Sequence, residues 1–165
     1  MNPAESKIIA NYLLADFEGE MRTTLNVLAA VPESKLDYRP DAKSKTALGL
    51  LRHLALEDAW LFNSVADGAF TPPPDDSDAC GIRNAGDAIA RYSSGVPAAM
   101  KRVAEMPAEK LVETIDMLGI YQLPALVILT MAVKHSIHHR GQLSTYLRAM
   151  GGKVPGIYGP SADTK

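Results

Sequence analysis

One short stretch near the carboxyl end organises the chain, and it reads His135-Ser136-Ile137-His138-His139-Arg140-Gly141-Gln142. The protein has four histidines, and three of them lie here. Upstream, Pro124 suits the first turn of a helix, and downstream the pair Gly151-Gly152 suits its end. We therefore expect a long helix over about 124–150 that carries the histidine cluster.

Helical geometry divides this cluster. Residues four apart on a helix lie one turn above each other, offset by roughly 40°. His135 and His139 therefore project to the same side, whereas His138 is turned by about 100° from His139 and points elsewhere. A third ligand must come from another helix, and the remaining histidine is His53, which lies in a mostly apolar segment that must face the core. Facing helices that supply inward side chains are a common way to build a metal site in a bundle.

The chemistry of such a site follows from its ligands. Three neutral imidazoles suit zinc, nickel, iron or copper, and they do not suit calcium or magnesium. Three protein ligands leave a position open to water or substrate, which is typical of catalytic sites, whereas structural zinc sites are usually closed by four. The alternative interpretation is that these histidines are ordinary exposed or hydrogen-bonded residues. The residues alone leave both interpretations open.

Several neighbours of the histidines are candidates for a role. Glu57 lies one turn after His53 on the same face, so it could be a general base, a fourth ligand or an acceptor that orients an imidazole, or it could simply be solvated. Asp58, rotated about 100° further, is expected to be solvated. Gln142 could form a hydrogen bond near the site, and Gly141 is expected to permit close approach of another helix.

Other side chains favour structural roles. Arg140 could bind a substrate carboxylate, but we expect it to tie its helix to a loop. Trp60, Tyr146 and Tyr158 are expected to pack, although Tyr158 could close over the site. Cys80 lies among acidic residues that raise a thiol pKa, so a nucleophilic role is not expected.

Apolar spacing predicts three further helices. The first covers about 4–30, with Asn2 as its cap and Pro32 after its end. The second starts after Ser44 or Thr46 and ends near Val65, and the third follows Asn84 and ends near Met106, with a kink or a break at Pro97. The Pro-rich segment 66–82 is a long surface connection that would allow parallel neighbouring helices, and 111–115 could be a short extended piece. The sequence thus predicts one all-α domain over 1–165, a four-helix bundle with a long second connection and an irregular C-terminal tail.

The composition limits the classes of partner. Hydrophobic residues make up 47% and charged residues 22%, with a net charge of −2 and no basic patch. Nucleic acids and anionic membranes are therefore not expected as partners. The longest apolar run is too short to span a bilayer, and the N-terminus lacks the pattern of a signal peptide. With a single cysteine and hence no internal disulfide, we expect a cytoplasmic protein.

The chain resembles the DinB-like (YfiT-like) family of damage-inducible bacterial proteins. The family pattern is a histidine in the second helix, here within Leu51-Arg52-His53, and His-x-x-x-His-Arg-Gly-Gln in the last, here from His135 to Gln142. Residues 36–44 and 151–163 also resemble the family's approach to its second helix and its tail. The resemblance implies a four-helix bundle, often a homodimer, with a divalent metal on three histidines; the positions that match the ligands are His53, His135 and His139.

The resemblance says less about the reaction. Zinc or nickel is the metal we expect first, with iron, copper or manganese as further options. Characterised relatives include thiol-dependent transferases, a maleylpyruvate isomerase group and proteins assigned as hydrolases. We therefore expect a metal-dependent hydrolase or thiol S-transferase that acts on a small molecule, with a low-molecular-weight thiol as a possible co-substrate and Glu57 as the candidate catalytic residue. The alternative is a metal-stabilised stress-response or binding module without catalysis.

Overall fold

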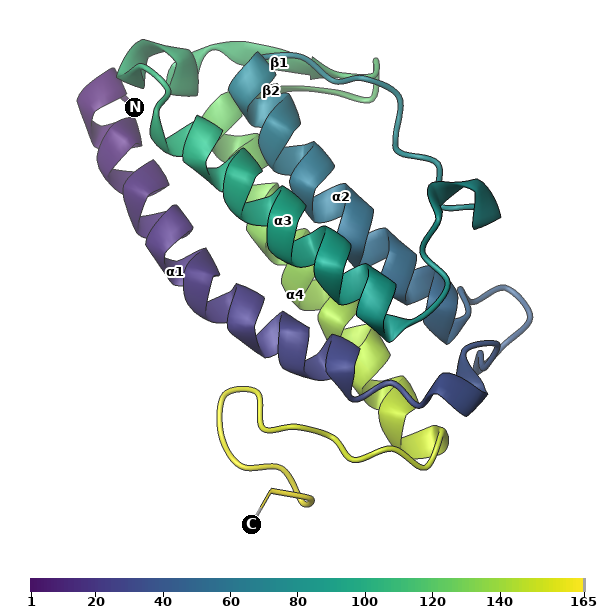
Figure 1. Ribbon diagram of the computed structural model, residues 1–165. Coiled ribbons are helices and arrows are strands. Elements are labelled where there is room, and N and C mark those ends of the chain that lie inside the picture. Colours follow the sequence, from purple (N-terminus) through teal and green to yellow (C-terminus); the bar gives the residue numbers. More distant parts are fainter. Residues whose placement is uncertain (165) are drawn as a thin grey trace.

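The computed structural model describes residues 1–164, which form a bundle of four long helices with one small hairpin (Figure 1). The helices are α1 (Pro3–Ala29), α2 (Ala47–Asp67), α3 (Ala85–Ala104) and α4 (Ala125–Ala149). Between α3 and α4, β1 (Thr114–Met117) pairs antiparallel with β2 (Tyr121–Pro124). The all-α bundle expected from the sequence is confirmed.

Side-chain caps fix where the first three helices begin. The Asn2 side chain accepts a hydrogen bond from the backbone N–H of Glu5, and the Glu5 carboxylate accepts one from Asn2 in return, which is a complete capping box. Thr46, the second of the two candidates for α2, accepts from the N–H of Gly49 at 3.0 Å. Asn84 caps α3 in the same way. These caps explain why the starting points could be predicted closely.

The direction of the helices follows from the long second connection. In Figure 1, α1 and α4 run one way and α2 and α3 run the other way, because residues 68–84 return along the length of the bundle before α3 begins. Arg52 holds this connection: its Nε donates to the carbonyl of Ile82 at 2.8 Å and its guanidinium pairs with Asp78 at 2.7 Å. The helices α2 and α3 are thus parallel neighbours, as the length of the connection between them allowed.

Two local expectations need correction. The helix α3 is not broken at Pro97 but runs continuously from Ala85 to Ala104. The proline ring lies on the exposed side of α3, so the carbonyl that loses its hydrogen bond can meet water. The extended piece begins at Thr114 rather than at Leu111, because residues 108–112 form a 3₁₀ turn.

The C-terminal tail is fixed to the bundle by a buried ion pair. Arg140 on α4 is 1% exposed and pairs with the carboxylate of Glu20 on α1. The guanidinium also donates to the hydroxyl of Tyr158 at 2.7 Å, and that hydroxyl donates to Glu20 at 3.1 Å. Arg140 therefore connects two helices and the tail, which is the structural role expected for it.

The helices offer no candidate for membrane insertion. Among residues 1–164, none of them combines the length and the apolar character that crossing a bilayer requires.

Candidate metal centre

The structure brings His53 on α2 together with His135 and His139 on α4. The Nε2 atom of His53 lies 3.0 Å from Nε2 of His139 and 3.2 Å from Nε2 of His135. Each of the three rings offers a nitrogen that lies within 4.8 Å of the other two. His53 is buried, and His135 and His139 are partly exposed, so the cluster can be reached from solvent on one side. These three residues could hold a metal ion.

The opposite nitrogen of each ring faces an oxygen acceptor. Nδ1 of His135 lies 3.1 Å from Asp58 Oδ1, and Nδ1 of His139 lies 2.8 Å from Gln142 Oε1. Nδ1 of His53 is 2.8 Å from Glu57 Oε1, although off the angle of an aligned hydrogen bond. Because carboxylate and amide oxygens only accept, they favour a proton on Nδ1 and leave the Nε2 lone pairs directed at one another. Metal-binding histidines in proteins are held in this way.

The spacing of the Nε2 atoms is close to that of ligands on one metal ion. Nitrogen ligands about 2.05 Å from a tetrahedral zinc ion lie about 3.3 Å from each other. The two separations, 3.0 and 3.2 Å, are close to this value. The donor set therefore fits a divalent transition metal with a position left open.

The surroundings of His135 and His139 shift the pKa values of these two rings in opposite directions. Burial alone would lower the pKa of His135, but its contacts with Asp58 and Glu57 raise that pKa to about 9. Burial, together with the charge of His53, lowers the pKa of His139 to about 4. Burial acts to raise the pKa of Glu57, yet His135 and His53 lower it to about 2. Glu57 is therefore ionised, and one face of the cluster carries negative charge toward a cation.

Asp58 is not solvated, contrary to the expectation from the sequence. Its side chain is 0% exposed and reaches Nδ1 of His135. The rotation of about 100° from Glu57 turns Asp58 toward the bundle interior rather than away from it. A signal for this was present, because Asp58 falls on the buried stripe of α2, four residues after Leu54 and four before Phe62.

The other predicted neighbours separate into three kinds. His138 is exposed, its ring centroid 4.8 Å from that of His139, and it is outside the three-histidine set. Gln142 reaches the site, as its spacing suggested. The expectation for Gly141 is wrong, since a Cβ atom there would meet nothing within 4 Å.

The two aromatic side chains on the ligand-bearing stripes bond elsewhere. The Trp60 indole donates to Thr71, and the Tyr146 hydroxyl donates to the carbonyl of Lys45. Tyr158 contacts Arg140 and Glu20. The structure thus assigns all three to packing and loop attachment.

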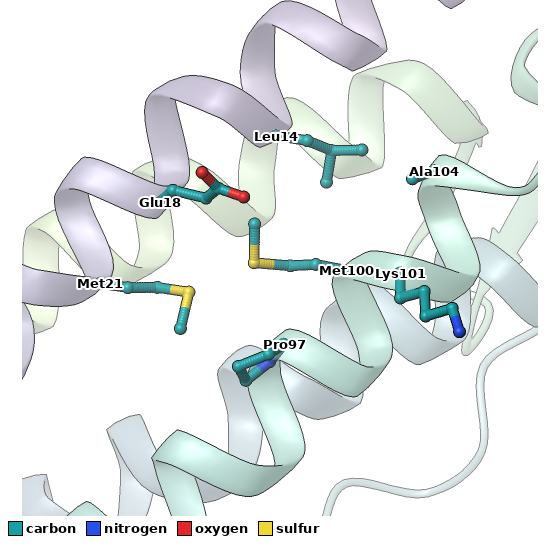
Figure 2. Close-up of a pocket in the computed structure, with 7 residues that line it drawn as sticks. All are labelled: Leu14, Glu18, Met21, Pro97, Met100, Lys101 and Ala104. Atoms are coloured by element: carbon teal, nitrogen blue, oxygen red, sulfur yellow. The ribbon is translucent and has the colours of Figure 1, made fainter.

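A cavity of about 340 Å³ lies elsewhere, between α1 and α3 (Figure 2). Figure 2 shows Met21 and Met100 reaching into it from the two helices. Its walls are mostly apolar, and the lining residues are Leu14, Glu18, Met21, Pro97, Met100, Lys101 and Ala104. This lining includes none of the residues of the histidine cluster, so the cavity is separate from that site.

Comparison with known proteins agrees with the fold. The DinB family matches residues 5–164. The chain is 26% identical over 154 residues to the uncharacterised protein YrdA of Bacillus subtilis, covering 93% of this chain and 90% of that protein.

Two solved structures share the fold. A DinB-like protein from Bacillus cereus ATCC 10987 has a TM-score of 0.73 at 21% identity, covering 88% of this chain and 95% of that one. The DinB-like protein YjoA from Bacillus subtilis has a TM-score of 0.71 at 18% identity, covering 91% and 99%. With the family match over nearly its whole length, the chain belongs to the DinB family.

Proposed function

We propose that this protein is a metal-dependent enzyme in which His53, His135 and His139 hold one divalent transition metal, with zinc or nickel as the first candidates. One observation carries the proposal: Nε2 of His53 lies close to Nε2 of both His135 and His139, while each Nδ1 faces an oxygen acceptor. Acceptors at Nδ1 of this kind orient metal-binding imidazoles and leave Nε2 for the ion.

The proposed reaction is hydrolysis of a small electrophile or transfer of a low-molecular-weight thiol onto one. A divalent ion in this position lowers the pKa of a water or thiol bound to it and polarises a carbonyl. The chain itself supplies a base. Glu57 Oε2 lies 3.4 Å from Nε2 of His135, beside the point where the three nitrogens meet. Glu57 accepts the proton of the attacking water or thiol and returns it to the leaving group.

Access to the cluster favours catalysis over a purely structural ion. The side chains of His135 and Glu57 are each 19% exposed, so a small molecule can approach the cluster from solvent. A sealed site with four protein ligands would instead be typical of a stabilising metal. Exposure and a nearby carboxylate together support the enzyme over the non-catalytic module.

The test compares Glu57→Gln with the matched control Glu18→Gln, an exposed glutamate on α1. Zinc- and nickel-loaded proteins are assayed on a panel of ester, amide and epoxide electrophiles, with and without low-molecular-weight thiols. We expect metal-dependent turnover that Glu57→Gln reduces by about 10²-fold or more while its metal content is retained. The control should keep full activity. Stoichiometric metal without turnover on any of these classes would instead support the non-catalytic module.

A further inference from the structure

The acceptors behind two of the three histidines are local. His53 is contacted by Glu57, four residues further along α2, and His139 by Gln142, three residues further along α4. Side chains at these spacings are neighbours on the surface of any single helix. Such contacts orient each ring on its own helix, but they do not place α2 relative to α4.

The acceptor behind His135 is different because it crosses between the helices. Asp58 lies on α2, and its Oδ1 is 3.1 Å from Nδ1 of His135 on α4, 77 residues away in the chain. Glu57 also approaches His135 from α2, but it does so at Nε2, which is the atom that an ion would occupy. The contact from Asp58 is at the opposite nitrogen, so it remains in place when Nε2 binds a metal.

A carboxylate is a costly side chain at the position of Asp58. The side chain is 0% exposed, and its ion-pair partner among residues 1–164 is His135. Within the same residues, its Oδ2 has no aligned hydrogen-bond partner. Burial of a carboxylate costs free energy unless the group is both paired and hydrogen-bonded, and asparagine would fill nearly the same volume without the charge. Packing alone therefore gives no reason for a carboxylate here, whereas a histidine that binds a cation does.

We propose that Asp58 is the positioning residue that sets His135 against His53 in the metal centre. Asp58 and His53 share α2, so a bond from Asp58 to Nδ1 of His135 directs the opposite nitrogen of that ring at His53, where the two Nε2 atoms lie 3.2 Å apart. A carboxylate at Nδ1 also makes the imidazole a stronger ligand for a cation. Asp58 touches neither ion nor substrate and acts through His135. The inference rests on the proposed function, because it requires that the histidines hold a metal.

The first measurement is the zinc dissociation constant by chelator competition. Groups that support a metal ligand change the affinity by about 10–100-fold when they are removed, so Asp58→Asn should weaken zinc binding about tenfold or more. The matched control is Asp67→Asn, which removes the same charge from the same helix, where Asp67 pairs with Arg102 on the exposed surface. The control should leave the zinc affinity unchanged. Gln142→Ala removes an exposed, neutral and local acceptor, and it should weaken binding less than Asp58→Asn does.

The second measurement is the visible absorption spectrum of the cobalt(II)-loaded proteins, which reports the geometry of the ligands around the ion. At saturating cobalt, Asp58→Asn should change the position and intensity of the bands, and Asp67→Asn should reproduce the wild-type spectrum. A residue that only stabilises the fold would leave the spectrum of the fully loaded protein unchanged. Asp58→Ala is the second variant if Asp58→Asn does not fold.

The two measurements together separate this inference from the proposed function. Stoichiometric metal in the wild type, with the same zinc affinity and the same cobalt spectrum in the folded Asp58 variants, would overturn the positioning role and leave the metal centre intact. A wild-type protein that binds no stoichiometric metal would overturn both.

Discussion

Replacing Arg140 by methionine should destabilise the fold more than removing the Tyr158 hydroxyl that contacts the same ion pair. The guanidinium is 1% exposed, and its partner Glu20 is 9% exposed. Arg140→Met leaves the Glu20 carboxylate buried without its cation and removes the donor to the Glu20 backbone carbonyl. Breaking one side of a buried ion pair costs about 3–5 kcal/mol. For a chain of this size, that corresponds to a fall in Tm of about 10 °C.

Two further variants separate the buried charge from simple loss of contacts. Tyr158→Phe removes a hydroxyl on a residue that is 74% exposed, so it should cost only about 1 kcal/mol. The double variant Glu20→Met/Arg140→Met removes both charges and should recover most of the loss, because apolar pairs replace buried ion pairs at little cost. Urea denaturation of the metal-free proteins measures all three. The argument would be refuted if Arg140→Met had the same free energy of unfolding as Tyr158→Phe or a higher one. It would also be refuted if the double variant were not more stable than Arg140→Met.

Four further predictions concern His135, Gly141 and Arg52. The pKa of His135 is raised to about 9, so metal binding near neutral pH must release its proton. The metal affinity should therefore rise up to about tenfold per pH unit and become constant above pH 9. A metal affinity that does not change with pH in competition titrations would contradict this. By the same linkage, His135 stabilises the metal-free protein fully below its ordinary pKa of 6.5, and this contribution is lost as the pH rises through about 9. Gly141→Ala should raise the free energy of unfolding by about 0.5–1 kcal/mol, because alanine favours the helix and its Cβ would meet nothing within 4 Å. A lower free energy of unfolding in urea would contradict this. Arg52→Met should speed proteolytic cleavage within 68–84 and leave metal content unchanged, and equal cleavage rates would mean that Arg52 does not hold this connection.

The helices could be predicted from the sequence because their signals are local. Apolar residues at helical spacing and the caps Asn2, Thr46 and Asn84 place the first three helices to within about two residues, which is the usual uncertainty of helix ends. The sequence predicted a kink or a break at Pro97, and no break occurs, because the cost of the proline depends on whether the freed carbonyl meets water. That in turn depends on the neighbouring helices and not on the local sequence.

The site could be predicted only in part, for the same reason. Spacing places His135 and His139 on one face, but their meeting with His53 depends on the antiparallel packing of α2 and α4. Asp58 was missed because a carboxylate on a helix is usually solvated, although its place in the apolar stripe pointed inward.

The central claim is that three histidines hold one metal ion, and metal content tests it most directly. Wild type, His135→Ala and His139→Ala are purified together with His138→Ala, whose ring is exposed and outside the cluster. Elemental analysis should find about one zinc or nickel per chain in the wild type and in His138→Ala, and almost none in the other two. The same substoichiometric metal in all four proteins would contradict the account.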